Sequence, residues 1–243
     1  MIRIYFSAEL QVGRQCMLPE SQAHHAVRVL RLKAGDAVVL FNGDGSEYSA
    51  TISQASRDRV ALDVTGRTAV DRESPLQVTL AQAISSGERM DYTVQKAVEL
   101  GIAVIQPITA ERSVVRLQGE RATRRVQHWQ SVVAASCEQC GRNRLPQVRP
   151  LVAFESFLAA QVGQGDALRL MLSPHSTRDL RALDRPAVPI VLLAGAEGGF
   201  STEEEHAAEH VGFLPVRLGP RVLRTETAAV AALAAMQAWW GDF

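Results

Sequence analysis

Short apolar runs in the first part of the chain alternate with polar residues, a pattern typical of β-strands separated by turns. It predicts strands over residues 2–6, 37–41, 47–53 and 60–64. The letters NGDG at residues 42–45 are typical of a tight turn after the second strand. One helix interrupts the strands, because apolar residues recur at helical spacing over residues 23–30. We therefore predict a small N-terminal β-barrel.

The pattern changes at the charged, proline-containing stretch of residues 71–75, after which apolar runs of strand length alternate with segments of helical periodicity. The predicted strands are residues 76–84, 104–107, 168–172, 190–194 and 215–218. The predicted helices are residues 89–100, 121–139, 154–160, 202–209 and 226–240. Strands that are apolar on both faces and alternate with helices are typical of a parallel sheet. The sequence thus predicts two domains, residues 1–72 and an α/β domain of residues 73–243.

Composition narrows the function classes. Apolar residues make up 47% of the chain and charged residues 21%, which excludes intrinsic disorder. The 26 basic and 26 acidic residues balance, which excludes a protein that binds nucleic acid by bulk charge. All but two of the cations are arginine, which suits local phosphate contacts, although genomic composition bias explains this equally well. The longest apolar run, residues 228–236, is too short to cross a bilayer, so we expect no membrane partner and a cytoplasmic location.

Several common site motifs are missing from the chain. Neither lysine follows a glycine at the spacing of a nucleotide-binding phosphate loop, and no G-x-S-x-G segment presents a nucleophilic serine. Cys137 with Cys140 and His206 with His210 form two pairs, but the pairs lie too far apart for a zinc finger. We therefore predict no metal site.

Three turns follow predicted strands in the last third of the chain, at residues 172–175, 195–199 and 219–221. In open α/β sheets ligands bind at the carboxyl ends of strands, so these turns are a candidate pocket, although ordinary connecting loops also fit the pattern. Ser201 is a predicted helix N-cap with Glu204 as its capping-box partner. Glutamates in the first turn of that helix disfavour phosphate, and a cationic ligand such as a sulfonium cofactor fits better.

Six segments carry a family resemblance. They are HHAVRVLRLKAGD at residues 24–36, QKAVELG at 95–101, ERSVV at 111–115, EQCGRNRLP at 138–146, LAGAEGGFS at 193–201 and LGPRVLRTETA at 218–228. In this order they resemble the RsmE family, bacterial methyltransferases that modify N3 of a uridine in 16S ribosomal RNA. The resemblance implies a SPOUT-type α/β domain with a trefoil knot, an N-terminal PUA-like barrel that binds RNA, and a homodimer. It also implies that 16S rRNA, free or in the small ribosomal subunit, is the substrate.

The resemblance assigns roles to individual residues. S-adenosyl-L-methionine would be held by Leu172, His175, Gly195, Glu197, Gly198, Leu218, Gly219, Leu223, Arg224, Glu226, Thr227 and Ala228. Ala196 replaces the proline that is usual in the family, which would loosen the second loop. RNA contacts would come from Arg28, Arg31, Arg112, Arg116, Arg121, Arg124 and Arg125, although a solvated helix face explains the last three equally well.

Methylation at N3 requires loss of a proton and stabilisation of the resulting anion. We expect Arg142 to stabilise that anion, with Arg224 as a second candidate, and Glu138 to act as the base, although a structural ion pair explains Glu138 equally well. Two other functions stay open: a non-catalytic RNA-binding module, and a SPOUT methyltransferase acting on transfer RNA or another ribosomal site.

Overall fold

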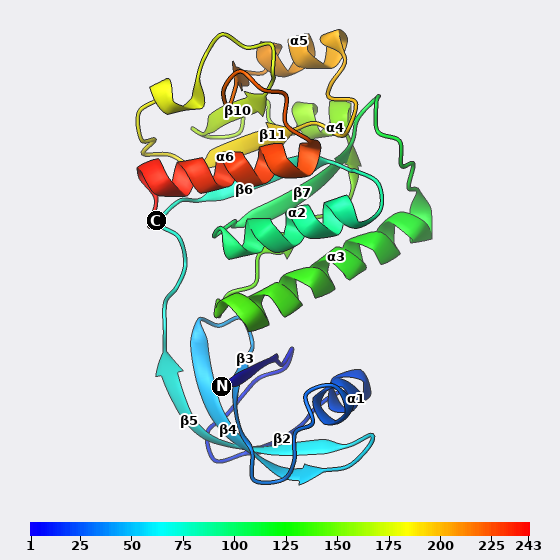
Figure 1. Cartoon of the computed structure of the whole chain (residues 1–243), viewed down its shortest axis with the longest axis vertical. Coiled ribbons are helices and arrows are strands. Elements are labelled where there is room, and N and C mark those ends of the chain that lie inside the picture. Colours follow the sequence, from blue (N-terminus) through cyan, green and yellow to red (C-terminus); the bar gives the residue numbers. More distant parts are fainter. The chain divides into compact units, whose positions relative to one another are not determined.

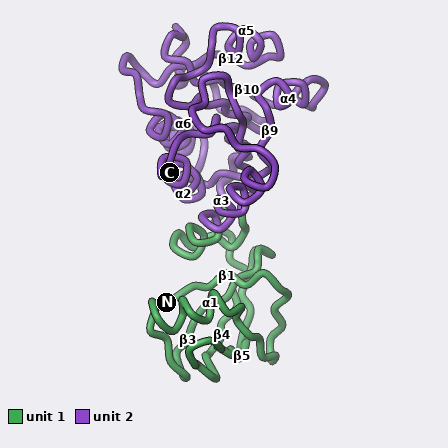
Figure 2. The backbone as a smooth tube through the Cα atoms, turned by 90° about the vertical axis from the view of Figure 1, so that its right-hand side faces the viewer, with its two compact units in different colours: residues 1–73, 134–145 green, residues 74–133, 146–243 purple.

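The computed structural model describes residues 1–243 and divides into two compact units. Unit 1 comprises residues 1–73 and 134–145, and unit 2 comprises residues 74–133 and 146–243 (Figure 2). Residues 134–145, which the sequence-based division assigns to the second domain, therefore group with unit 1. The division into domains of residues 1–72 and 73–243 stays a prediction. None of the helices combines the length and the apolar character that crossing a membrane requires.

Unit 1 is built on a five-stranded sheet. Its elements are β1 (Ile2–Tyr5), β2 (Gln15–Met17), α1 (Glu20–Arg28), β3 (Ala37–Phe41), β4 (Ser46–Ala55) and β5 (Val60–Ala69). The strand order is β1-β3-β4-β5-β2, with β1 and β2 at the two edges. The β1–β3 pair is parallel and the other pairs are antiparallel. The four strands predicted here are confirmed, whereas β2 was missed because three residues carry too little periodicity.

Unit 2 contains a second sheet. Its strands are β6 (Val78–Ala83), β7 (Val104–Thr109), β8 (Gln147–Val148), β9 (Val152–Ala153), β10 (Leu168–Leu172), β11 (Ile190–Ala194) and β12 (Leu214–Val216). Their order is β12-β10-β11-β6-β7-β8, with β9 also on β7, and every pair is parallel. The predicted parallel sheet is therefore confirmed. The two-residue strands β8 and β9 were not predicted.

Helices cover both faces of this sheet (Figure 1). The helices are α2 (Glu88–Glu99), α3 (Gly119–Cys140), α4 (Phe154–Ala159), α5 (Thr202–His210) and α6 (Thr225–Trp240), with a short 3-10 turn η1 (Leu180–Ala182). Helices α2 and α6 pack side by side on one face. On the other face α4 and α5 bury Phe157 and Ala208 against Ala81 and Leu193 of the strands. Helix α3 continues from unit 2 into unit 1.

The parallel arrangement decides where a site can form. Strands β12, β10, β11, β6 and β7 are consecutive neighbours and run in one direction. The loops that follow them therefore meet at one edge of the sheet, where ligands bind in open α/β folds.

Candidate active site

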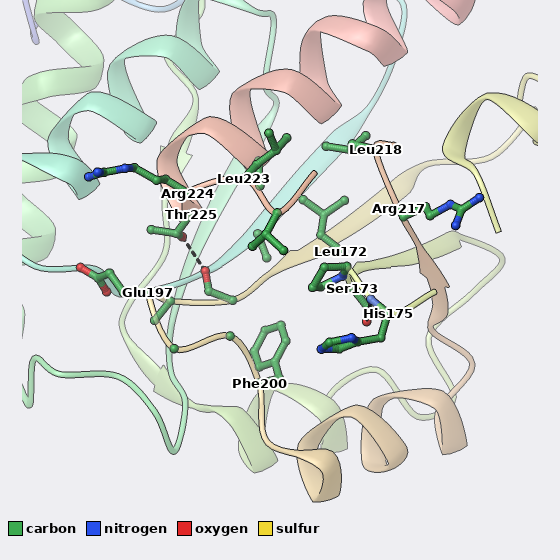
Figure 3. A pocket seen from close by; sticks show the side chains of 18 of the residues that line it. Leu172, Ser173, His175, Glu197, Phe200, Arg217, Leu218, Leu223, Arg224 and Thr225 are labelled. Carbon is green, nitrogen blue, oxygen red and sulfur yellow. Dashed lines mark hydrogen bonds between the residues drawn. The ribbon is translucent and has the colours of Figure 1, made fainter. Parts of the chain in front are cut away.

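A cavity of about 620 Å³ lies at this edge of unit 2. Its walls are the segments after β10, β11 and β12, the three turns singled out in the sequence (Figure 3). Most of the predicted cofactor residues line this cavity: Leu172, His175, Gly195, Glu197, Gly198, Leu218, Gly219, Leu223, Arg224, Glu226 and Ala228. Thr227 is not among the lining residues and is exposed on α6. The structure thus brings the rest of the predicted set together in a space suited to a cofactor-sized ligand.

Glycines in the loop after β11 leave space that a side chain would fill. A Cβ added to Gly195 would lie 3.0 Å from the Gly199 Cα, and one added to Gly198 would lie 2.9 Å from the Arg112 Cβ. Gly199 has a φ of +67°, a conformation that L-residues rarely adopt. The loop can fold so tightly, and expose its backbone to a ligand, because these positions carry no side chain.

A buried hydrogen-bond network holds this loop from behind. Gln82, fully buried on β6, donates from Nε2 to the Gly195 carbonyl (3.0 Å) and to the Thr225 Oγ1 (3.1 Å). The Thr225 hydroxyl in turn donates to the same Gly195 carbonyl at 2.6 Å (Figure 3). One polar side chain of the sheet interior therefore joins the loop after β11 to the start of α6.

Glu197 is an ionised carboxylate at the cavity wall. Burial tends to raise its pKa, but hydrogen bonds from the Ser86 backbone N–H, the Ser86 hydroxyl and the Arg89 guanidinium outweigh this and lower the pKa to about 2. The side chain therefore remains negatively charged at neutral pH. Because Arg89 pairs with it at 2.8 Å, this charge is largely balanced within the cavity wall.

The start of α5 supports the same loop. Ser201 and Glu204 form the predicted capping box, which is confirmed. The buried Glu204 also accepts a hydrogen bond from the Glu111 backbone N–H at 2.7 Å. The neighbouring Arg112 donates to the carbonyls of Gly198 (3.2 Å) and Phe200 (3.0 Å). The segment after β7 therefore fastens the loop after β11.

The other arginines at the cavity differ in their partners. Arg217 forms an ion pair with Asp179 at 3.0 Å. Arg221 and Arg224 are exposed, and their side chains form no hydrogen bond or ion pair. These two guanidinium groups are therefore available to a ligand of the cavity.

Two of the predicted catalytic residues belong to unit 1 and do not line the cavity. The buried Arg142 forms an ion pair with Glu73. Glu138 accepts a hydrogen bond from the Tyr5 backbone N–H at 2.9 Å, and burial raises its pKa. Both side chains therefore have structural contacts within unit 1, and their catalytic roles stay predictions.

The predicted RNA-binding arginines fall into two groups. Three of them donate to backbone carbonyls: Arg112 as described, Arg116 to Glu111 at 2.7 Å, and Arg125 to Gly87 at 3.4 Å. The others lie on helices or directly after one and are Arg28, Arg31, Arg121 and Arg124. Among them Arg31, with a φ of 55°, is the single non-glycine residue of the chain in the left-handed region.

Sequence reasoning missed Arg89, which lines the cavity from the first turn of α2. No motif marks the preceding segment, residues 84–87. The signal is the strand order, because β6 lies beside β11 and its loop must therefore border the loop after β11.

The cavity suits S-adenosylmethionine by its chemistry. The glycines allow close backbone approach, and Leu172, Leu218 and Leu223 provide apolar walls.

Comparisons with known proteins agree with this reading. A family model described as an RNA methyltransferase domain matches residues 72–237, and one described as an RNA methyltransferase PUA domain matches residues 18–65. The ribosomal RNA small subunit methyltransferase E of Buchnera aphidicola (strain APS) is 32% identical, over 99% of this chain and 94% of that protein. The protein of the same name from Bacillus subtilis is 28% identical, over 88% of this chain and 86% of its own length.

Two solved structures are similar over the whole chain. A putative methyltransferase from Legionella pneumophila with bound S-adenosylmethionine is 40% identical with a TM-score of 0.95, covering 100% of this chain and 99% of that one. A ribosomal RNA small subunit methyltransferase E from Neisseria gonorrhoeae, bound to S-adenosylmethionine, is 40% identical with a TM-score of 0.91 and the same coverage.

Proposed function

This chain belongs to the RNA methyltransferase family, and from that premise we propose that it transfers the methyl group of S-adenosylmethionine to N3 of a uridine in 16S ribosomal RNA, of the U1498 type. The observation that carries the proposal is the cavity at the carboxyl edge of the unit 2 sheet. Its glycine loops have the chemistry that a sulfonium cofactor needs, and structures 40% identical to the chain bind that cofactor. Because the substrate is ribosomal RNA, the protein would work in the cytoplasm.

The chain's own residues would hold the cofactor mainly through backbone. The loops at residues 195–199 and 218–224 would offer N–H and carbonyl groups, since glycine allows close approach there. S-adenosylmethionine, when bound, supplies a methyl group activated by a positively charged sulfur. Leu172, Leu218 and Leu223 would exclude water from it. Arg224, exposed at the cavity without a partner, would bind the RNA or stabilise charge on the uracil.

Two further features belong to the proposal. A trefoil knot would form where the segment between β12 and α6 passes through a neighbouring loop, as the resemblance to SPOUT methyltransferases implies. A homodimer would cover apolar side chains near the C-terminus, where Trp239 is 49% and Phe243 70% exposed. Analytical ultracentrifugation at micromolar concentration would measure directly whether the protein is a dimer.

Titration of S-adenosylmethionine into the purified protein tests the enzyme class. We expect saturable heat and a rise in melting temperature, and the absence of both would reject a methyltransferase. Mass mapping of ribosomal RNA from cells that lack the gene tests the target. Loss of one N3-methyluridine, restored by the wild-type gene, is the expected result, and retention of every N3-methyluridine would reject the assignment.

A further inference from the structure

Arg89 and Glu226 bring opposite charges to the cavity from the first turns of two helices. Arg89 is the second residue of α2 and Glu226 the second residue of α6, and both residues line the cavity. The Arg89 Nε lies 3.9 Å from the Glu226 Oε1, while its Nη1 donates to Glu197 at 2.8 Å. The other terminal nitrogen of Arg89, Nη2, makes no hydrogen bond. The guanidinium is thus held by two carboxylates and keeps one nitrogen free.

Glu226 has an oxygen that nothing in the chain satisfies. Its Oε2 is buried and accepts no hydrogen bond, although the side chain as a whole is 17% exposed. Buried carboxylate oxygens are normally paired, so an unpaired one indicates a missing donor. Because Glu226 lines the cavity and rotation about its last side-chain bond exchanges the two carboxylate oxygens, a ligand of the cavity can supply that donor.

The other cavity carboxylates are less suited to accept a proton. Glu197 is bonded to the N–H and hydroxyl of Ser86 and to Arg89, and these contacts keep it ionised. Glu205, in the first turn of α5, has no buried oxygen that lacks a partner. Glu226 is therefore the cavity carboxylate with a vacant, buried acceptor.

The proposed reaction needs two groups that this pair provides. Uracil N3 carries a hydrogen, and once it is lost the negative charge spreads over the two flanking carbonyl oxygens. A carboxylate oxygen accepts such a proton, and a guanidinium stabilises such an anion. Resting on the proposed function, we propose that the Glu226 carboxylate takes the N3 proton of the target uridine and that Arg89 stabilises the uracil anion.

The step balances in atoms and charge. The N3 proton passes to the Glu226 carboxylate and from there to solvent. The electron pair left on N3 forms the new bond to the methyl carbon, and the pair of the broken carbon–sulfur bond stays on sulfur. The pair differs from Arg142 and Glu138, which bind to Glu73 and to the Tyr5 backbone within unit 1.

Two variants test the roles separately. Glu226→Gln keeps the shape of the side chain but removes the acceptor carboxylate, and its single-turnover methylation rate should fall about 100-fold or more. This inference assigns Glu226 to the uridine and not, as the family resemblance implies, to the cofactor, so the variant's S-adenosylmethionine affinity, measured by calorimetry, should fall by less than tenfold. RNA made with 5-fluorouridine at the mapped position, whose N3 hydrogen is more acidic, should restore much of the rate. The exposed Glu88→Gln, next to Arg89 on α2, is the matched control and should match wild type throughout.

A second readout needs no turnover. With S-adenosylhomocysteine bound, the ¹⁹F resonance of the 5-fluorouridine RNA reports N3 ionisation as the pH is varied. Arg89→Met should raise the midpoint of that titration by about one pH unit or more, a tenfold shift against the anion. Arg89→Lys retains the positive charge and should return the midpoint part of the way to the wild-type value. The exposed Arg181→Met is the control.

The outcomes separate this inference from the proposed function. A wild-type rate in Glu226→Gln, or an unchanged ¹⁹F midpoint in both Arg89 variants, overturns the assignment. A loss of cofactor affinity of tenfold or more in Glu226→Gln also overturns it, because the carboxylate then holds the cofactor. If the wild-type protein itself methylates no uridine at N3, the proposed function fails. If the wild-type protein methylates N3 and the Glu226 and Arg89 variants match it, the proposed function holds and this inference fails.

Discussion

Replacing Gly195 with alanine should weaken cofactor binding without unfolding the protein. The added methyl would lie 3.0 Å from the Gly199 Cα and 3.1 Å from its carbonyl carbon, both backbone atoms. Gly199 would have to move by a few tenths of an ångström. Gly195 itself cannot yield easily, because its carbonyl accepts hydrogen bonds from Gln82 and Thr225. The strain therefore falls on the loop that lines the cavity.

The size of the effect follows from these contacts. Overpacking of this kind costs about 1 to 3 kcal/mol, and weakening one hydrogen bond to the carbonyl costs about 1 kcal/mol. If most of this opposes the loop conformation that binds the cofactor, the dissociation constant rises about 10- to 100-fold, which is about 1.4 to 2.8 kcal/mol. Isothermal titration with S-adenosylmethionine measures that change, and thermal unfolding of the free protein checks its fold.

Gly165→Ala is the matched control. Its Cβ would meet no atom within 4 Å and its φ is not in the left-handed region, so the affinity should stay within about twofold of wild type. An affinity of Gly195→Ala equal to that of the control would refute the view that the tight approach of Gly195 to Gly199 shapes the cofactor site.

Three further variants test other contacts. Glu197 has a folded pKa of about 2, below its ordinary 4.5, so it contributes stability above about pH 4.5 that disappears as the pH falls toward 2. Urea unfolding should show that Glu197→Gln lacks this pH-dependent contribution, about 1 to 2 kcal/mol once solvent screening of this exposed residue is counted, and an equal loss of stability in both proteins between those pH values would contradict it. Arg142→Ala leaves the Glu73 carboxylate without its buried partner and should lower the free energy of unfolding by about 3 kcal/mol. Its cofactor affinity should not change, and its turnover should be lost if Arg142 is catalytic. Wild-type turnover in this variant would remove that role. Arg112→Ala removes two hydrogen bonds to the Gly198 and Phe200 carbonyls and should weaken the binding of S-adenosylmethionine about fivefold. If cofactor affinity is instead unchanged and the salt dependence of RNA binding falls by about one charge, Arg112 is a phosphate contact.

The elements of unit 2 could be predicted because buried parallel strands read as continuous apolar runs. Strands β6, β7, β10, β11 and β12 were each found within a few residues of their observed bounds. Strands β8 and β9 were missed, since two residues cannot show a period. Their pairing with β7 is set by the chain path around them and not by local sequence.

The candidate site was predicted only as far as consecutive residues form it. The turns at 172–175, 195–199 and 219–221 could be located because each directly follows an apolar run. Gln82, Arg89 and the loop-holding role of Arg112 could not, because they depend on the neighbours of β6 and β7 in the sheet. Arg142 differs from these residues, because its sequence motif favours a catalytic role whereas in the structure it forms an ion pair with Glu73 of the same unit.

The composition of the cavity loops limits what they can do in a reaction. Gly195, Gly198, Gly219 and the leucines around them offer backbone groups and apolar surface, none of which takes up a proton. The loops also carry His175, which is exposed, and Glu197, which its contacts with Ser86 and Arg89 keep ionised. Our inference places the acid–base chemistry beside the loops, where Arg89 and Glu226 lie in the first turns of α2 and α6. Because these two helices pack against each other, their packing sets the spacing between the two charges. A change in that packing should therefore alter turnover, and it should also reach the loop after β11, because Thr225 at the start of α6 donates to the Gly195 carbonyl.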